Sequence, residues 1–535
     1  MQPLGPLNAQ QRREEAYARR FANATQVRSQ PTFAGMNNGD DDRYPDRRGS
    51  FTKGLPHNNL GEVHPGAYMQ LLSALRSGSP SAFEAVPLGG APRARKLLNP
   101  QAGLAFDTEG FDAHTFAIPP APRFDSAEMA AEMVELYWMA LLRDVPYANF
   151  GTDPNVQAAC DDLNKLADFT GPRDPSAGKV TPQTLFRCGL PGELEGPFIS
   201  QFMLKNVPFG AQGWKQVMRS GKPGVDYLTS LEDWLHAQNG QTPVTTDEAY
   251  FDPAARYIVS GRELSQWVHI DVLFQAYFNA LLIMDAPRSE LRTPVGGGIE
   301  AAANPGNPYN LSLTQEGFGT FGGPGYITLL CEVATRALKA VWWNKWFVHR
   351  RLRPEVFAGR IHFQKAGAKD YGIHKQVLES EALARVGEKL KKNGNAFYLL
   401  PMAFPEGSPI HPAYGAGHAT VAGACVTVLK ALFNAIDPSL TILEPERVDP
   451  SDPTKLVPAN DLKGKLTVEG ELNKLAMNVA NGRNIAGVHW RTDASASLRL
   501  GEQIAIGVMR DHKPMFNEAF NGWELNTFDG QRIIV

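Results

Sequence analysis

The chain has 535 residues, of which 43% are hydrophobic and 20% charged, so it is long enough to bury a large core. Its 53 basic and 56 acidic side chains leave a net charge of −3, which argues against nucleic acid or an anionic membrane as a partner attracted by overall charge. Four scattered cysteines are too few for a disulfide framework or a cysteine zinc site. These properties predict a soluble globular protein in which any anion binding is local.

The N-terminal part of the chain is rich in Gly, Pro, Arg and Asn. This composition predicts an extended arm over residues 1–120 that packs on the body or on partner subunits. No apolar stretch of the signal-peptide kind begins the chain, so a cytoplasmic location is expected by default. The apolar stretch 267–286 carries Asp271, Gln275 and Asn279, and therefore predicts a buried core helix rather than a membrane span.

Helical patterns dominate the rest of the chain. Asp125 followed by Glu128 predicts a capping box before an amphipathic helix at 126–145. Alternating strand patterns are nearly absent, so we predict a mainly α fold with two helix bundles in one large domain. Apolar residues at three- and four-residue spacing predict further helices at about 262–285, 325–350, 418–434, 470–483 and 492–510. The bundles are assigned to 121–315 and 316–535, with the Gly-, Pro- and Asn-rich segment 285–314 as their connection.

Three segments of the last third carry candidate chemistry, and the first is "KWFVHRRLRPEVFAGR" at 345–360. In a helix Lys345, His349 and Arg353 would share one broad face, and Pro354 would end that helix. The pattern predicts a lysine and an arginine that point at one place. A solvated basic helix end is the alternative for this segment alone, and His349 fits a packed core histidine equally well.

The second segment is "HPAYGAGHAT" at 411–420, in which His411 and His418 lie seven residues apart. An apolar helical pattern follows at once, and a glycine-containing loop that runs into a helix N-terminus presents unpaired N–H groups to an anion. Gly415 and Gly417 would let the backbone approach such a ligand closely. An ordinary glycine-rich turn is the alternative.

The third segment is "NGRNIAGVHWRTDAS" at 481–495, in which Arg483 precedes His489 by six residues. Asp493 follows His489 by four residues and could accept a hydrogen bond from one imidazole N–H, which would fix the tautomer. Taken together, the segments provide three cations, backbone donors and several histidines. That set suits a tetrahedral oxyanion, with one histidine as nucleophile or metal ligand and another as acid–base group.

The three segments resemble the tripartite signature of the vanadium-dependent haloperoxidases and of the acid phosphatases that share their fold. Seven residues separate Lys345 from Arg353, a longer spacing than in phosphatases and fungal chloroperoxidases, and "HRRLRPE" resembles the algal and cyanobacterial bromoperoxidases. His411 matches the additional histidine of those bromoperoxidases. The similarity extends to "SFTKGLPHN", "NPQAGLAFDTEG" and "AEMVELYWMALLRDVPY" outside the signature.

The resemblance implies a role for each candidate residue. His489 is expected to bind the vanadium of a vanadate cofactor. His418 is expected to take a proton from hydrogen peroxide, while His411 tunes that transfer or halide access, and Lys345 also activates the bound peroxide. The product would be hypohalous acid, formed most readily from bromide, which halogenates small organic acceptors. The expected cofactor-binding residues are Lys345, Arg353, Ala416, Gly417, His418, Arg483 and His489.

Ala416 departs from the family pattern, which usually has serine there. The missing hydroxyl is expected to cost on the order of 1 to 3 kcal/mol in oxyanion affinity. Two alternative functions remain: a phosphatase that forms a phosphohistidine at His489, and a non-catalytic anion-binding protein. The resemblance also suggests a homo-oligomer, either a dimer or a larger assembly such as a dodecamer, and leaves room for a structural calcium ion.

Overall fold

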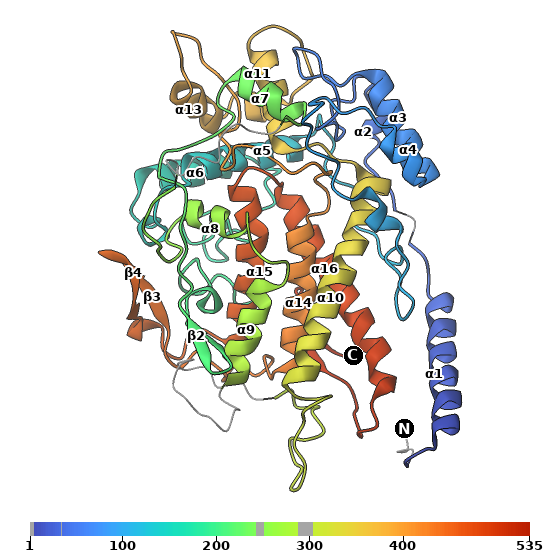
Figure 1. Ribbon diagram of the computed structural model, residues 1–535. Coiled ribbons are helices and arrows are strands. Elements are labelled where there is room, and N and C mark those ends of the chain that lie inside the picture. The colour runs from blue at the N-terminus through green and yellow to red at the C-terminus, as the bar shows by residue number, and fades with distance from the viewer. Residues whose placement is uncertain (1–4, 34, 242–250, 287–302) are drawn as a thin grey trace.

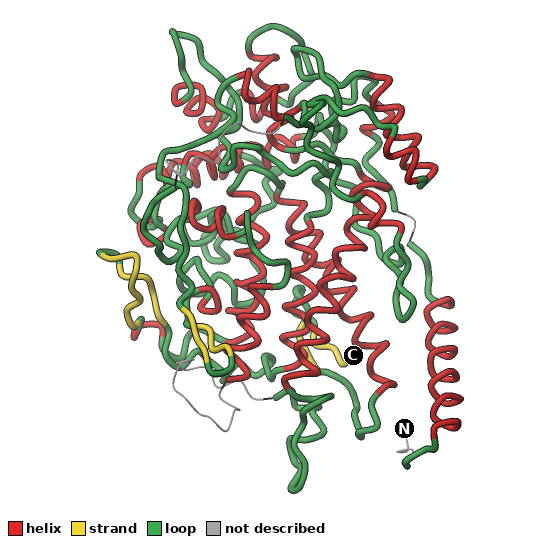
Figure 2. The backbone as a smooth tube through the Cα atoms, viewed as in Figure 1, coloured by secondary structure: helices red, strands yellow, loops and turns green. Residues whose placement is uncertain are grey.

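The computed structural model describes residues 5–33, 35–241, 251–286 and 303–535. Helices and long loops make up nearly all of this part of the chain (Figure 2). The described strands form three antiparallel hairpins, β1–β2, β3–β4 and β5–β6. Their bounds are β1 Val207–Phe209, β2 Gln212–Trp214, β3 Glu446–Asp449, β4 Asp452–Pro458, β5 Glu524–Asn526 and β6 Arg532–Ile534. The expectation of a mainly α fold is confirmed.

Four long helices lie side by side at the centre of the molecule (Figure 1). They are α10 (Gly323–Trp343), α14 (Gly417–Leu432), α15 (Val468–Ile485) and α16 (Arg491–His512). Helix α14 packs against the other three and is buried along nearly its whole length, because its sequence is apolar on every face. Four of the helices predicted from periodicity therefore exist, and they form the core around α14.

The backbones of α14 and α16 approach unusually closely. A Cβ atom on Gly423 would lie 2.0 Å from the carbonyl oxygen of Leu498, and one on Gly501 would lie 2.0 Å from that of Thr420. No side chain fits at these two positions, so the glycines permit the crossing. The crossing places the start of α14 beside the loop that leads into α16.

Shorter helices surround this centre. Helix α5 begins one residue later than predicted, because the hydroxyl of Ser126 accepts the N–H of Met129 at 3.1 Å; the expected capping box of Asp125 and Glu128 is wrong. Helices α11 and α13 lie near α5 in Figure 1. The surrounding helices are α5 (Ala127–Leu141), α6 (Pro154–Asn164), α7 (Leu231–Gln238), α8 (Gly261–Trp267), α9 (Gln275–Asp285), α11 (Pro354–Lys365), α12 (Lys375–Leu378) and α13 (Glu381–Lys389).

The helix predicted at 262–285 is wrong in one respect: it is two helices, α8 and α9, separated by the non-helical residues 268–274. Tertiary contacts hold this break. The carbonyl oxygen of Val268 accepts from Arg483 at 2.7 Å, and the imidazole of His269 stacks on Phe404 with ring centroids 3.7 Å apart. Apolar periodicity continues through the break, so it could not reveal these contacts.

The N-terminal region contains helices that composition did not predict: α1 (Ala9–Ser29), α2 (Asp40–Arg43), α3 (Pro65–Ser77) and α4 (Pro80–Glu84). Helix α1 buries none of its side chains, and it stands beside the body in Figure 1. Helix α3 buries one face on the body. The division into an arm and two bundles stays a prediction, and most of the expected connection 285–314 lies outside the described residues.

Within the described ranges, no helix is long and apolar enough to cross a membrane. All four cysteines are free. No group of three or more His, Cys, Asp or Glu side chains in the same ranges could hold a metal ion, so the calcium expectation gains no support there.

Asp40 provides a stability test away from the central helices. It is buried, and its Oδ2 accepts from the N–H of Phe124 at 2.9 Å and from Asn38 at 2.8 Å. Burial raises the pKa of Asp40 to about 6, and the charge of Asp125 adds to the rise. The folded state therefore favours the protonated acid, and stability falls as pH rises from the unfolded pKa toward 6.

We expect Asp40→Asn to raise the free energy of unfolding at pH 8 by up to about 3 kcal/mol, because the amide keeps an acceptor oxygen without a buried charge. Urea denaturation at pH 4 and pH 8 measures the effect, which should be small at pH 4. Asp42→Asn, at an exposed neighbouring position, is the control. Equal stability of the wild type and Asp40→Asn at pH 8 would contradict the assignment.

Candidate active site

Lys345 enters the site from a widened helical turn. Helix α10 passes into a π-helical turn, Asn344–His349, and the ammonium of Lys345 donates to the carbonyl oxygens of Pro412 at 2.9 Å and Ala413 at 3.0 Å. Burial and the nearby Arg353 charge lower the pKa of Lys345 well below its usual value. An anion bound beside this ammonium would favour its charged form.

Arg353 joins two of the predicted segments. Its Nη1 donates to the carbonyl oxygen of Val488 at 2.6 Å and lies 3.0 Å from Nε2 of His489. Its Nη2 lies 2.9 Å from Nδ1 of His411, and its Nε donates to the His411 carbonyl at 3.0 Å. One buried guanidinium therefore connects the loop that contains His411 with the loop that contains His489.

The expectation that Lys345, His349 and Arg353 share one face of a single helix is wrong. Arg350 has a left-handed backbone with φ 45°, so the chain leaves the helix before Arg353 is reached. Arg353 directly precedes α11, and Pro354 begins that helix, a position where its missing N–H costs nothing. Lys345 and Arg353 still reach the same site, from two helices.

His349 packs in the core. Its ring lies against the edge of Tyr414, with centroids 4.8 Å apart, and neither ring nitrogen has a hydrogen-bond partner among the described residues. Burial lowers the pKa of His349 to about 3, so the imidazole is neutral. Of the two interpretations of this residue, the packed histidine is the one that its contacts support.

The glycine loop runs into α14 as predicted. Gly417 is the first residue of α14, and Ala416 before it makes no side-chain capping bond. A Cβ on Gly417 would lie 3.1 Å from the ring of Trp342, so any larger residue would crowd this wall. The N–H groups of a first helical turn lack intrahelical acceptors, and the loop that carries His411 leads directly into this turn.

Arg483 closes the cationic set from the last turn of α15. Its Nη1 donates to the Val268 carbonyl at 2.7 Å, and the guanidinium lies over Phe404 at 5.7 Å from the ring centroid. Its Nε is buried without a hydrogen-bond partner in the described part of the chain. Burial lowers the pKa of Arg483, which an anion in the site would oppose.

His489 is held in one orientation by Asp493. The Nδ1–H of His489 donates to Oδ2 of Asp493 at 2.8 Å, as the four-residue spacing predicts. Burial and the Arg353 charge lower the pKa of His489 well below its usual value. The imidazole is therefore neutral, and its Nε2 keeps a lone pair that faces Arg353.

The sequence did not indicate the charges behind Asp493. Oδ1 of Asp493 accepts from Arg351 at 2.9 Å, and Arg351 also donates to Glu132 of α5 at 2.7 Å. Burial raises the pKa of Asp493, and the Arg351 charge opposes that rise. Glu132 is one of three glutamates on the otherwise apolar α5, and a charged residue among apolar ones was the available signal for it.

His418 has a partner that the sequence analysis also missed. Its Nε2 lies 2.9 Å from Oδ1 of Asp271, in the break between α8 and α9. The His418 side chain is 28% exposed, whereas His489 is buried, so His418 is the histidine that solvent and small molecules reach. An acidic residue inside an apolar stretch was the signal for Asp271.

His411 lies between the cations and an aromatic wall. Its ring centroid lies 4.9 Å from that of Trp342, and Arg353 donates to it as described above. Burial, together with the charges of Lys345 and Arg353, lowers the pKa of His411 well below its usual value. The ring is therefore neutral and can accept a proton only when an anion offsets those charges.

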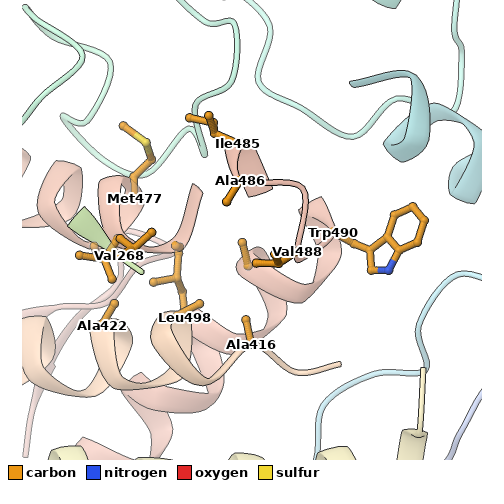
Figure 3. Packing of buried hydrophobic residues seen from close by; sticks show 14 of the residues in the cluster. Val268, Ala416, Ala422, Met477, Ile485, Ala486, Val488, Trp490 and Leu498 are labelled. Carbon is orange, nitrogen blue, oxygen red and sulfur yellow. The ribbon is translucent and has the colours of Figure 1, made fainter. Parts of the chain in front are cut away.

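The assembled site fits an oxyanion. The contacts of Lys345 and Arg353 within the described residues are to carbonyl oxygens and imidazoles, and Arg483 retains an unpartnered Nε. Three buried cations with so little direct compensation stabilise a bound anion of two or three charges. Of the expected binding residues, Ala416 and Gly417 offer no polar side chain; Figure 3 shows Ala416 among buried apolar residues such as Val488 and Leu498.

Comparison with known proteins identifies the family. A family model described as the VCPO second helical-bundle domain matches residues 332–518. The vanadium-dependent bromoperoxidase of Corallina pilulifera is 38% identical over 90% of this chain and 90% of its own. The chain belongs to the family of the vanadium-dependent bromoperoxidases. A further member, from Ascophyllum nodosum, is 34% identical over 99% of this chain and 93% of its own.

The bromoperoxidase fold extends over the whole chain. The homohexameric structure of the second vanadate-dependent bromoperoxidase from Ascophyllum nodosum matches with a TM-score of 0.90 and 32% identity. That match covers 99% of this chain and 94% of the other. The similarity is therefore not confined to the three segments that suggested it, and both the fold class and the family resemblance are confirmed.

Proposed function

We propose that this protein is a vanadate-dependent haloperoxidase, which oxidises halide with hydrogen peroxide to hypohalous acid that halogenates organic acceptors. Bromide is the preferred halide. The observation that carries the proposal is the cluster of three buried cations, Lys345, Arg353 and Arg483, around a neutral histidine. Relatives named for vanadium and bromide, at 34 to 38% identity over most of the chain, support it.

The chain's residues would bind the cofactor in defined ways. Vanadate, when bound, supplies a Lewis acid that activates peroxide without changing oxidation state. His489 would hold vanadium through Nε2, which requires Arg353 to turn its Nη1 from that nitrogen to the anion. Lys345, Arg353, Arg483 and the N–H of Gly417 would hold the oxygens.

Two histidines would move protons. His418, partly exposed and oriented by Asp271, would accept a proton from hydrogen peroxide. His411 is buried against Arg353 and Trp342 and would tune this transfer or the approach of halide. The positions of His418 and His411 in the site, and the charges around them, are the basis for these two roles.

The test is bromination of a phenolic dye by metal-stripped protein titrated with vanadate, with phosphate as competitor. We expect activity to appear with vanadate and to fall with phosphate, because both anions need the same three cations. The same titration with chloride and iodide ranks the halides. Hydrolysis of a phosphate monoester without bromination would instead establish the phosphatase, and binding without either reaction would establish an anion-binding protein.

Ala416→Ser should strengthen vanadate binding. A hydrogen bond to a charged group contributes about 1.5 to 3 kcal/mol, which corresponds to roughly tenfold or more in affinity. The measurement is the vanadate concentration that half-restores activity to stripped protein. Ala419→Ser, in the first turn of the same helix, is the matched control and should leave that concentration unchanged. Equal or weaker affinity in Ala416→Ser would show that the hydroxyl does not reach the anion.

A homo-oligomer is part of the proposal. The neighbour from Ascophyllum nodosum is homohexameric. Helix α1 buries no side chain, and its Tyr17 and Phe21 are 70% and 64% exposed. Packing against another subunit would bury this exposed apolar surface and stabilise the helix. Light scattering on the purified protein measures the assembly size.

A further inference from the structure

A cavity of about 230 Å³ lies directly behind the break between α8 and α9. One side is formed by the end of β2 and the residues that follow it, including Trp214 and Met218. The other side is formed by Trp267, Ile270 and Asp271. None of the roles described above uses this cavity.

The 268–271 segment is a thin wall between the cavity and the active site. On the site side, Val268 accepts from Arg483 at 2.7 Å and Asp271 bonds His418 at 2.9 Å. On the cavity side, Trp267 and Ile270 form part of the lining. Asp271 belongs to both, so the cavity lies one side chain from the histidine proposed to move protons.

The lining is suited to a flat aromatic molecule with a polar group. Trp214, Trp267 and Ile270 provide aromatic and aliphatic surface. Gln216 is fixed by donating to the carbonyl oxygens of Phe202 at 2.7 Å and Lys205 at 2.8 Å, and it accepts from Asn279 at 3.2 Å. These amides form a preorganised polar end against which a ring hydroxyl can bind.

The volume suits a ligand of one ring. A cavity of about 150 Å³ already holds benzene, whereas pockets for drug-sized ligands start at roughly 300 Å³. The present volume lies between these values. Lys215 and Arg219 also line the cavity and are exposed, so an anionic substituent is tolerated at its opening.

We propose that this cavity binds a small monocyclic phenol as the organic acceptor, beside the site where halide is oxidised. The proposal rests on the halide oxidation proposed above. In the reaction, bromide loses two electrons to hydrogen peroxide as the O–O bond breaks; one oxygen forms hypobromous acid, and the other takes up a proton from solution and leaves as water. The bound ring then exchanges one C–H bond for a C–Br bond, and the released proton leaves with the hydroxide of hypobromous acid as water.

Competition between two phenols tests the proposal. The holoenzyme receives bromide, peroxide and an equimolar mixture of p-cresol and 3,5-di-tert-butylphenol, whose substituted ring is too bulky for the cavity. The ratio of brominated products is compared with that from reagent hypobromous acid. We expect the enzyme to favour p-cresol about fivefold more than the reagent does, the order of one aromatic contact in a pocket.

Trp214→Ala and Ile270→Ala should return the product ratio toward the reagent value while peroxide consumption with bromide stays unchanged. Both residues are exposed, at 40% and 75%, so their truncation leaves the fold intact. Met69→Ala, at a 46% exposed position on α3, is the control and should keep the wild-type ratio. Binding of p-cresol without peroxide, followed by saturation-transfer NMR, should weaken in the two cavity variants and not in the control.

A wild-type ratio equal to that of reagent hypobromous acid would overturn the proposal, as would p-cresol binding that both cavity variants retain in full. Failure of the proposed halide oxidation would give a different result from failure of the cavity proposal. In that case no peroxide is consumed with bromide at any vanadate concentration, whereas the NMR measurement still decides whether the cavity binds the phenol.

Discussion

His489→Ala is expected to abolish vanadate-dependent bromide oxidation. The neutral imidazole is held by Asp493 so that Nε2 faces Arg353, and alanine would remove the proposed vanadium ligand. Loss of even an outer partner of a metal-binding histidine typically costs about 10- to 100-fold, so loss of the ligand itself should cost at least on the order of 100-fold. Activity is measured across a vanadate titration, so that weaker binding and slower turnover are separated.

The surrounding network should survive this substitution. Arg353 keeps the Val488 carbonyl, and Asp493 keeps Arg351 and the N–H of Trp490. The circular dichroism spectrum and the melting temperature are therefore expected to remain close to the wild type. His362→Phe is the matched control, since His362 is also buried but stacks on Phe397 in another part of the molecule. Full activity in His489→Ala would remove His489 from the site.

The long helices could be predicted from the sequence because each follows a single rule along its length. Apolar residues at helical spacing mark α10, α14, α15 and α16, and no tertiary contact in their interiors overrides that pattern. Two of the segments that depart from prediction lie next to the site. The break at 268–274 contacts Arg483 and His418, which are distant in sequence. The left-handed Arg350 likewise contacts the distant Asp41.

The residues of the candidate site also fall into two groups: those in short motifs, which could be predicted, and those whose partners are distant in sequence, which could not. Lys345, Arg353 and His489 lie in short motifs whose spacing is visible, and the structure brings them together around one point. Asp271 contacts His418 across 147 positions, and Glu132 is separated from Arg351 by 219. A single sequence shows at most that such an acidic residue is unusual in an apolar stretch; it does not indicate which distant residue is its partner. Asp493 was predictable because its contact with His489 spans a single helical turn.

His418→Ala is expected to slow bromide oxidation by about 10²- to 10⁴-fold, the usual contribution of a positioned acid–base group. Vanadate affinity should change much less, because Lys345, Arg353, Arg483 and the backbone N–H groups all remain. This division between rate and binding distinguishes His418 from His489, whose loss should affect both. The measurement is the turnover rate at saturating vanadate, together with the vanadate concentration that gives half of it.

Asp271→Asn separates the orientation of His418 from the charge behind it. In the wild type, Nε2 of His418 lies 2.9 Å from the Asp271 carboxylate. The asparagine amide keeps an oxygen at this position but carries no negative charge. If Asp271 serves only to orient the ring, this variant should retain nearly full turnover. If the carboxylate also stabilises the imidazolium that forms when peroxide loses a proton, turnover should fall between the wild type and His418→Ala.

Wild-type turnover in His418→Ala would contradict the role proposed for His418. It would transfer the proton-accepting role to His411, the other histidine beside the cations.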